Sequence, residues 1–316
     1  FMGFFNHKTD NFILMKLDLY QVDAFANKIF EGNPAAVVPL DKWLPKKKMQ
    51  SIAQENNLSE TAFFCKSGEN FDLRWFTPNR EVKLCGHATL ASAFVIFNLL
   101  NYKLDKISFK SLSGMLYAEK SGDLIKMDLP SQKPIKCDTP KLLEHGLGVK
   151  PEACYFNEDY VAIFENEINI ISVQPDFQKL KMLDSRGVII TALGGEYDFV
   201  SRAFFPKYTI LEDPVTGSAY TKLVPYWFER TGKKKFNSKQ MSKRGGELFC
   251  EYDGERVFIS GYARLYMRGE IYIDWDDLIS IANKLVDFYN EENDKDRRYI
   301  FEVISENRIK LKNKEI

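Results

Sequence analysis

The sequence predicts an α+β protein in which two halves share one plan, with short strands surrounding a single buried helix. Residues 86–100 and 220–230 have helical length and are apolar on nearly every side. A helix without a polar face is stable only when it is buried. Glycine, proline and asparagine divide most of the remaining sequence into short runs of β-branched and aromatic residues, a pattern typical of strands joined by turns.

Strands predominate in the first half, on both sides of its buried helix. The predicted strands are residues 16–25, 35–40, 57–64, 71–76, 107–112, 115–119 and 124–129. Residues 67–70 form a turn signal between two of these runs, which predicts a hairpin. A further helix begins near Pro45 and runs through Met49, Ile52 and Ala53, because proline is favoured in a first turn and these apolar residues have helical spacing.

The second half repeats this plan without a residue-by-residue repeat. The predicted strands are residues 160–164, 168–173, 187–192, 198–204, 239–242, 247–252, 256–260 and 264–267. A short helix is expected over 175–183, and the glycine-containing turn 212–219 leads into the apolar helix 220–230. Pro225 is expected to kink that helix or to mark its true start.

Changes in composition divide the chain into five parts. We expect an N-terminal extension over residues 1–14, a first lobe over 15–129, a Pro-, Lys- and Ser-rich linker over 130–140, a second lobe over 141–275 and a helical extension over 276–316. Residues 276–289 have the spacing of an amphipathic helix. Its apolar stripe needs a partner surface, which we expect on the protein body or a second subunit.

Composition excludes several classes of protein. The chain of 316 residues carries 44 basic and 44 acidic side chains, so neither nucleic acid nor a membrane surface is expected as its main partner. Its five cysteines are scattered without a C-x-x-C pair, which argues against a disulfide framework or a structural zinc site. No ligand-spaced cluster or dinucleotide fingerprint is visible, so no metal or organic cofactor is expected. The cytoplasm is the default compartment.

Glu60 is the first candidate for chemistry. Period-2 alternation places it on one strand face with Ala62 and Phe64, so a carboxyl group lies in an apolar row. Desolvation raises the pKa of such a group, which suits a residue that takes and returns a proton near neutral pH. The alternative is a strand carboxylate in a salt bridge at a sheet edge.

Two helix starts supply the other candidates. Gly86 and His87 open the first buried helix, and Gly217 and Ser218 open the second. The free N–H groups and positive dipole end of a helix start bind anions, here a substrate carboxylate. Each polar residue also has a structural interpretation, since His87 could cap its helix and Asp213 and Ser218 are ordinary N-cap types. We interpret Cys85 as a buried structural cysteine.

Several spaced motifs, taken together, resemble one protein family. They are residues 22–25 (VDAF), 32–37 (GNPAAV), 56–63 (NNLSETAF), 74–78 (RWFTP), 84–90 (LCGHATL), 212–219 (EDPVTGSA), 244–246 (RGG) and 261–264 (GYAR). The chain resembles the PhzF, or phenazine biosynthesis-like, family over residues 15–274. The resemblance implies the diaminopimelate epimerase-like fold, with two pseudo-symmetric lobes, each a β-barrel-like sheet wrapped around a central helix, and an active site between them.

The same resemblance implies a homodimer, cofactor-free isomerisation and a set of site residues. The catalytic residues it implies are Glu60 as acid and base, His87, Asp213 and Ser218. Substrate binding falls on Gly86, Ala88, Gly217 and Ala219. Related epimerases use two facing cysteines, and the presence of Asp213 in the second lobe argues against that chemistry here. Tyr220 stands where many relatives have histidine.

Three functions therefore compete. The first is an isomerase that moves a proton on a small carboxylic acid, most simply a cyclic one. The second is a non-catalytic protein of the same fold that binds a small ligand or a protein. The third is a hydrolase with Ser218, His87 and Asp213 as a triad, although Gly-x-Ser-x-Gly is absent.

Overall fold

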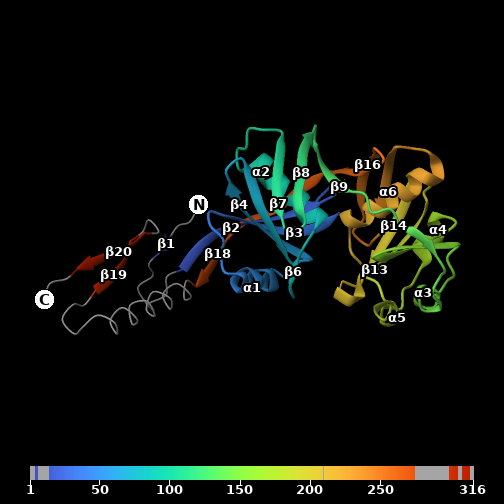
Figure 1. Cartoon of the computed structure of the whole chain (residues 1–316), viewed down its shortest axis with the longest axis horizontal. Coiled ribbons are helices and arrows are strands. Elements are labelled where there is room, and N and C mark those ends of the chain that lie inside the picture. Colours follow the sequence, from blue (N-terminus) through green and yellow to red (C-terminus); the bar gives the residue numbers. More distant parts are fainter. Residues whose placement is uncertain (1–3, 6–13, 209, 275–298, 305–307, 314–316) are drawn as a thin grey trace. The chain divides into compact units, whose positions relative to one another are not determined.

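A computed structural model describes residues 4–5, 14–208, 210–274, 299–304 and 308–313 (Figure 1). The chain divides into two compact units, residues 19–268 and the two terminal segments 1–18 and 269–316. The larger unit contains every residue of the candidate site. No helix among the described residues is both long and apolar enough to cross a membrane.

The first lobe is a sheet that encloses helix α2 (Gly86–Leu99) and carries α1 (Lys46–Asn56) on its outside (Figure 1). Its strands are β2 (Leu14–Ala24), β3 (Asn33–Leu40), β4 (Glu60–Ser67), β5 (Asn70–Phe76), β6 (Glu81–Val82), β7 (Lys106–Ser111), β8 (Gly114–Ser121) and β9 (Leu124–Pro130). A two-residue strand, β1 (Phe4–Phe5), pairs with the start of β2.

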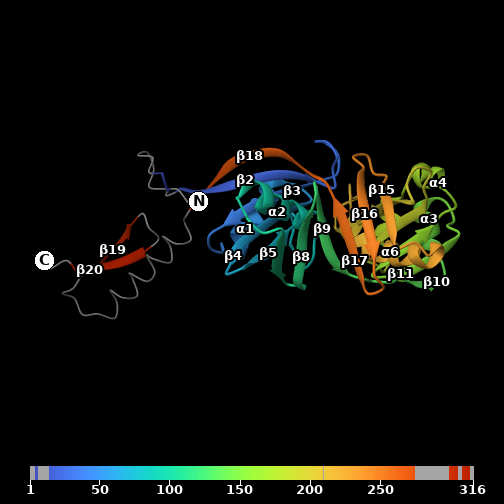
Figure 2. The ribbon, with the colours of Figure 1, turned by 90° about the horizontal axis from the view of Figure 1, so that it is seen from above.

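The second lobe encloses helix α6 (Gly217–Thr231) in the same way. Its strands are β10 (Ile135–Cys137), β11 (Ala153–Asn157), β12 (Asp159–Ile163), β13 (Gly187–Leu193), β14 (Phe199–Phe204), β15 (Lys235–Gln240), β16 (Gly246–Tyr252) and β17 (Arg256–Gly261). Its short helices are α3 (Lys141–Leu147), α4 (Glu167–Ser172), α5 (Phe177–Lys181) and η1 (Pro206–Tyr208). The strand that follows β17, β18 (Ala263–Asp274), runs beside β2 of the first lobe (Figure 2).

Strand pairing shows the pseudo-symmetry directly. From β2 through β3, β4, β5, β7 and β8 to β9, the ladders are antiparallel, parallel, antiparallel, parallel, antiparallel and antiparallel. The series from β11 through β12, β13, β14, β15 and β16 to β17 has the same order of orientations. The predicted α+β fold with two matching lobes is therefore confirmed.

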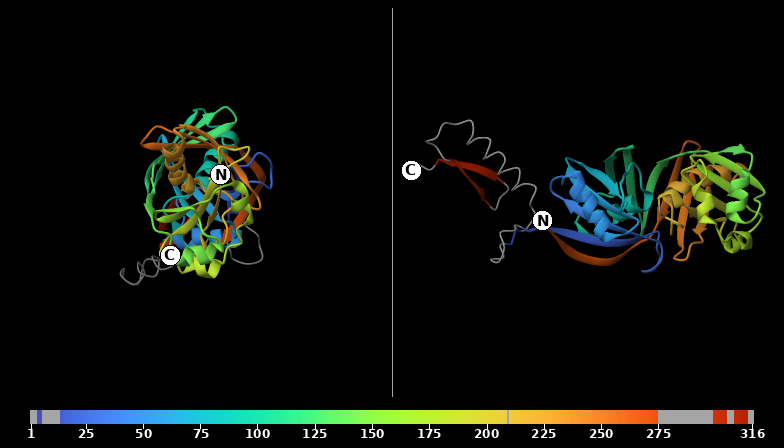
Figure 3. Two further views of the ribbon diagram at one scale, coloured as in Figure 1. Left: turned by 90° about the vertical axis from the view of Figure 1, so that its right-hand side faces the viewer. Right: turned by 90° about the horizontal axis from the view of Figure 1, so that it is seen from below.

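The two lobes are joined by a ladder as well as by the chain. Strand β9 of the first lobe pairs antiparallel with β17 of the second, with Leu129 opposite Val257 and Ile125 opposite Gly261 (Figure 2). The view from below in Figure 3 shows the same continuity between the lobes. Neither sheet is therefore complete without a strand of the other lobe.

Both central helices are buried as their composition predicts. Helix α2 ends one residue before the predicted limit, and its only strongly exposed residue is Asn98 near the C-terminus. Helix α6 begins at Gly217, before the predicted start, so Pro225 lies in its interior and does not mark its beginning. The apolar cores around α2 and α6 form one continuous cluster.

Three predictions need correction. Residues 168–173 are not a strand, because Asn166 caps helix α4 by accepting a hydrogen bond from the Asn169 N–H at 3.1 Å. The segment 130–140 is not only a linker, since it contains β10, which pairs with β11. The strand predicted at 239–242 begins earlier, because residues 235–240 of β15 pair in full with β16.

The C-terminal extension is only partly described. The amphipathic helix predicted over residues 276–289 lies outside the described residues. Further along, β19 (Tyr299–Ile304) and β20 (Arg308–Asn313) pair antiparallel, so this part of the extension is a hairpin and not a helix.

Candidate functional site

The two central helices meet at their N-termini. A Cβ atom placed on Gly86 would lie 3.1 Å from the Gly217 Cα, and one on Gly217 would lie 3.2 Å from the Gly86 Cα. Side chains at these positions would be in unusually tight contact with backbone, so glycine at both helix starts permits the close approach. The first turns of α2 and α6 therefore lie in contact, and the predicted residues around them come together.

Glu60 and His87 form the first-lobe part of the site. Glu60 is the first residue of β4, where it pairs with Ala35 of the parallel strand β3. Its Oε2 lies 3.2 Å from His87 Nε2, and both side chains are buried. Neither atom has a hydrogen bond of acceptable geometry within the described part of the chain. Two buried polar atoms without partners are costly, and they leave hydrogen-bonding capacity for a ligand.

Asn33 connects the two lobes across the site. Its Nδ2 donates to Asp213 Oδ1 and to the Val215 carbonyl, each at 2.8 Å. The same nitrogen lies 3.2 Å from His87 Nδ1. One amide group at the start of β3 thus fixes the carboxylate of the second lobe and packs against the histidine of the first.

Asp213 is held from its own lobe as well. Thr216 Oγ1 donates to Asp213 Oδ2 at 2.5 Å, and Gln240 Nε2 donates to the Asp213 carbonyl at 2.6 Å. Gln240 also accepts from the Thr216 N–H at 2.9 Å, so it ties the loop before α6 to strand β15. These contacts leave the Asp213 carboxylate little freedom to rotate.

Burial separates the pKa values of the three ionisable site residues. Desolvation raises the pKa of Glu60 to about 8, with a further contribution from the charge of Asp213. Desolvation also raises the pKa of Asp213 to about 6, opposed by its hydrogen bonds from Thr216 and Asn33. Burial lowers the pKa of His87 to about 3, so its imidazole is neutral at physiological pH. The site therefore contains a pair of carboxyl groups that titrate on either side of neutrality.

Cys85 is buried as predicted, but it also borders the site. Its Sγ lies 3.5 Å from His87 Nδ1. One potential ligand atom from each of Glu60, Cys85 and His87 lies within 4.8 Å of the others, a grouping that the sequence did not reveal. Thiolate is the form that binds metals, and burial raises the pKa of the Cys85 thiol well above its usual value, which opposes that use.

The remaining predicted residues separate into two groups. Gly217 and Ser218 begin α6, and their N–H groups have no acceptor among the described residues. The Ala219 N–H instead donates to the Thr216 carbonyl at 3.0 Å, so it is not available to a ligand. Gly86 and Ala88 are buried in the first turn of α2.

Ser218 does not form a triad with His87 and Asp213. Its hydroxyl lies 3.3 Å from Arg186 Nη2, while the contacts of His87 are Glu60, Asn33 and Cys85. The hydrolase interpretation therefore lacks its nucleophile–base contact. Tyr220, the residue that replaces a common histidine, is fully buried and packs on Phe199 inside the second lobe, outside the site.

A second buried charge cluster lies beside Ser218. Arg186 Nε donates to Asp159 Oδ1 at 2.8 Å, and its Nη2 forms a very short contact with Asp159 Oδ2. Lys222 Nζ of α6 lies 3.2 Å from the same Oδ2 and donates to Gln132 Oε1 at 2.9 Å. Asp159 and Lys222 are completely buried, whereas the Arg186 side chain is 29% exposed.

Sequence reasoning missed Asn33, Gln240 and the Arg186 cluster. Asn33 lies in the Gly-Asn-Pro segment, which has the composition of a turn. The sequence therefore predicts only a turn at this position and gives no indication of a site residue. A lysine within the apolar helix 220–230 was the one visible anomaly, because Lys222 cannot be buried without a partner.

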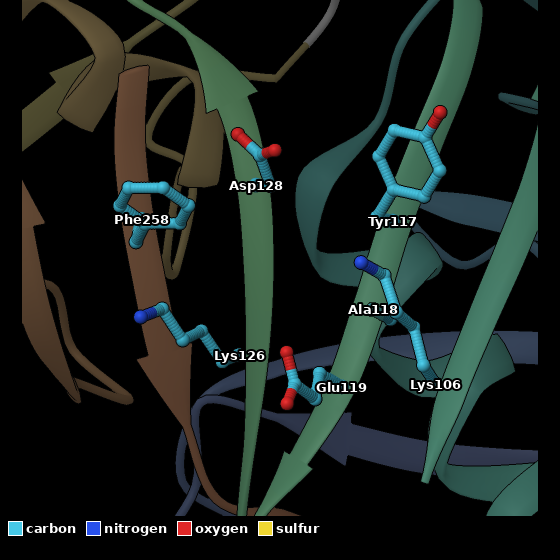
Figure 4. A pocket seen from close by; sticks show the side chains of 7 residues that line it. All are labelled: Lys106, Tyr117, Ala118, Glu119, Lys126, Asp128 and Phe258. Atoms are coloured by element: carbon cyan, nitrogen blue, oxygen red, sulfur yellow. The ribbon is translucent and has the colours of Figure 1, made fainter. Parts of the chain in front are cut away.

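Two surface hollows formed by the described residues lie away from the candidate site. The hollow in Figure 4 has a volume of about 100 Å³ and lies among β7, β8, β9 and β17. Two of its four charged lining residues already have ion-pair partners, since Lys126 lies 3.2 Å from Glu251 and Asp128 lies 2.7 Å from Arg256. It contains none of the site residues.

Comparison with known proteins identifies the family. The family model of phenazine biosynthesis-like proteins, PhzC-PhzF, matches residues 22–269. The chain belongs to the phenazine biosynthesis-like family. An uncharacterized isomerase of Pseudomonas aeruginosa is 47% identical over 259 residues, covering 82% of this chain and all of that protein. Another uncharacterized isomerase, from Halalkalibacterium halodurans, is 44% identical over 82% of this chain and 99% of its own length.

Solved structures agree with this assignment. A crystal structure of a PhzF-family protein from Enterococcus faecalis superposes with a TM-score of 0.80 and 47% identity, covering 82% of this chain and all of that one. These relatives of the phenazine biosynthesis-like family support an isomerase in general terms.

Proposed function

We propose that this member of the phenazine biosynthesis-like family is an isomerase that moves a proton between two positions of a small, most simply cyclic, carboxylic acid without a cofactor. The observation that carries the proposal is the buried carboxyl of Glu60, whose Oε2 faces His87 Nε2 at 3.2 Å without a hydrogen bond. A buried carboxyl with one unpartnered oxygen and its pKa raised to about 8 is suited to proton exchange with carbon.

The roles of the neighbouring groups follow from their positions. Glu60 takes the proton from carbon and returns it at another position. Neutral His87 orients the substrate, while Asp213, fixed by Asn33 and Thr216, polarises it from the second lobe. The N–H groups of Gly217 and Ser218 supply donors at the positive end of α6. Each group is held on a regular element or tied to one, which favours precise positioning.

The Pseudomonas aeruginosa relative is named an uncharacterized isomerase, which supports isomerisation as the class of reaction. The fold also resembles that of a hydroxyproline epimerase from Agrobacterium vitis, at 10% identity and a TM-score of 0.52. At that identity the likeness concerns the fold alone, so the substrate class rests on the site.

Solvent isotope exchange tests the proposal. Cyclic carboxylic acids are incubated with the protein in D₂O, and recovered acid is analysed by mass spectrometry. We expect deuterium incorporation that Glu60→Gln reduces at least about 100-fold, since general acid–base groups contribute about that much or more. Glu119→Gln, which alters an exposed carboxylate in the hollow of Figure 4, serves as the matched control and should leave exchange unchanged. Exchange that survives Glu60→Gln would exclude Glu60 as the proton carrier.

A further inference from the structure

Two of the five cysteines face each other across one strand ladder. Cys137 ends β10 and Cys154 lies in β11, and the antiparallel register places them directly opposite. Residues in opposite positions project their side chains from the same face of a ladder. Strand register brings the two cysteines together from separate positions in the chain, so the sequence alone does not reveal the pair.

The backbone of this ladder places the two thiols within reach of a covalent bond. Residues directly opposite in an antiparallel ladder have Cβ atoms about 4.5–5.5 Å apart. A disulfide needs a Cβ–Cβ distance of about 3.5–4.5 Å, so a closure of about one ångström is sufficient. Strand β10 is only three residues long, so few ladder bonds oppose that movement.

Burial gives the two thiols different roles. Cys137 is partly exposed, whereas Cys154 is buried in the same apolar core as Leu143 and Leu147 of α3. Burial, followed by the charge of nearby Cys137, raises the pKa of the Cys154 thiol above its usual value. The thiolate is the reactive form, so oxidation begins at accessible Cys137 and Cys154 is the resolving partner.

The other three cysteines provide an internal comparison. Cys65 faces Asp72 across β4 and β5. Cys250 faces Phe236 across β15 and β16, and Cys85 lies directly before α2. All three are buried, and in the ladders of the described strands none of them is opposite a second cysteine. We therefore expect oxidation of this chain to form a disulfide at one pair.

The pair lies in the segment that joins the two lobes. Strand β10 belongs to residues 130–140, which follow β9 of the first lobe. The same segment carries Gln132, whose Oε1 accepts from Thr221 Oγ1 at 2.8 Å and from Lys222 Nζ at 2.9 Å in α6. A covalent bond between β10 and β11 would fasten the other end of this segment to the second lobe.

We propose that Cys137 and Cys154 form a redox-active dithiol that a peroxide oxidises to a cross-strand disulfide and that small thiols reduce again. The Cys137 thiolate attacks one peroxide oxygen, which forms a sulfenic acid and releases hydroxide. The Cys154 sulfur then displaces the sulfenic oxygen as water. In sum, two thiols lose two electrons and two protons, and one hydrogen peroxide becomes two water molecules. Two molecules of glutathione reverse the reaction through a mixed disulfide.

Peroxide treatment of the full-length protein tests the pair directly. Reduced protein is exposed to hydrogen peroxide, the remaining thiols are blocked with N-ethylmaleimide, and tryptic peptides are analysed by mass spectrometry without reduction. Trypsin cleaves at Lys141 between the two cysteines, so the disulfide joins two separate peptides. The variants are Cys137→Ser, Cys154→Ala and Cys250→Ala. Cys250→Ala is the matched control, because it alters a buried strand cysteine that faces no other cysteine in its two ladders.

We expect the wild type and Cys250→Ala to form the Cys137–Cys154 disulfide and to recover both thiols with reduced glutathione. Cys137→Ser should form no disulfide. Cys154→Ala should stop at a sulfenic acid on Cys137, which dimedone labels. Closure of the loop 137–154 should raise the Tm of the oxidised wild type by about 5 °C, and this rise should be absent in both pair variants.

Four results would overturn the dithiol. The first is a wild type that keeps both thiols at peroxide concentrations that oxidise free cysteine. The second is a disulfide that joins other cysteines or two molecules, and the third is an oxidised pair that glutathione does not reduce. The fourth is a lower Tm after oxidation, because β10 would then have to leave β11 to form the bond. The dithiol shares no residue with the Glu60–Asp213 site, so these outcomes do not depend on the proposed function.

Discussion

Asn33 of the first lobe donates a hydrogen bond to Asp213 of the second at 2.8 Å, and this contact passes through the centre of the candidate site. The bond is one of the two that restrain the rise in the pKa of Asp213. The same side chain touches His87, so a single amide sets the surroundings of an acid in one lobe and an imidazole in the other.

Replacement of Asn33 should therefore change the titration of Asp213. In Asn33→Ala we expect the pKa of Asp213 to rise above about 6, because burial is then opposed by one bond fewer. Carbonyl carbon chemical shifts measured against pH would show this, together with a loss of stability of about 1–3 kcal/mol. Asn27→Ala, which removes a bond to Glu247 at 2.7 Å, is the control. An unaltered Asp213 titration would mean that the contact has no electrostatic role.

The Gly86–Gly217 contact predicts a steric effect on the junction of the lobes. Gly86→Ala places a methyl group 3.1 Å from the Gly217 Cα, so the two helix starts must shift apart by a few tenths of an ångström. Overpacking of this kind costs about 1–3 kcal/mol, and we expect a lower Tm together with reduced exchange activity. Gly269→Ala, where no atom lies within 4 Å of an added Cβ, is the control and should have a normal Tm. A Gly86→Ala protein as stable and active as the wild type would contradict the close approach.

The rate of deuterium exchange should depend on pH through Glu60. If Glu60 takes the proton from carbon, its ionised form is the active one, and kcat/KM should increase with pH and level off above about 8. The increase should be absent in Glu60→Gln. A rate that instead decreases through pH 8 would identify the protonated carboxyl as the active form and transfer the role of base to Asp213.

The free energy of unfolding should also depend on pH through Glu60, and it should fall as the pH rises. The pKa of Glu60 is about 8 in the folded protein, against 4.5 for the unperturbed side chain. Below pH 4.5 the carboxyl is protonated in both states and has no effect. Between those values the unfolded chain ionises first, so the free energy of unfolding falls as pH rises, and the decrease ends above about pH 8.

Glu60→Gln removes this ionisation. We expect the variant to exceed the wild type in stability by on the order of 3 kcal/mol at pH 7 and by almost nothing at pH 4. Urea unfolding at the two pH values measures the difference, and the exposed Glu119→Gln provides the baseline. A gain that is the same at both pH values would show that the carboxyl is not desolvated in the folded state.

Much of the fold could be predicted because local pattern and tertiary structure agree. Helix α2 is apolar on nearly every side, and only burial satisfies that composition, so its limits were predicted within one residue. The face of β4 that carries Glu60 followed from simple alternation, and Ala62 and Phe64 are buried beside it.

The errors arose where local signals compete. Residues 168–173 contain three isoleucines, which favour a strand, but Ile168 and Ile171 are exposed and only Ile170 reaches the core. The segment forms helix α4 instead of a strand, because the Asn166 side chain caps the start of the helix. Contacts such as Asn33 with Asp213, or Arg186 with Ser218, join positions 180 and 32 residues apart. The first contact depends on how the two lobes pack, and the second depends on how the segment before β13 packs on the start of α6 within one lobe. No spacing along the sequence reveals either of them.

The ladder between β9 and β17 has a consequence for how this protein can be divided. A cut in the segment 130–140 would expose the hydrogen-bonding edge of β9 in one fragment and that of β17 in the other, and open edges of this kind invite aggregation. Each half made alone should accumulate in inclusion bodies. Produced together, the halves should recognise each other through those edges and restore one soluble particle, which makes this a natural position for a split reporter. Separate halves that are both soluble and folded would show that the shared ladder is dispensable.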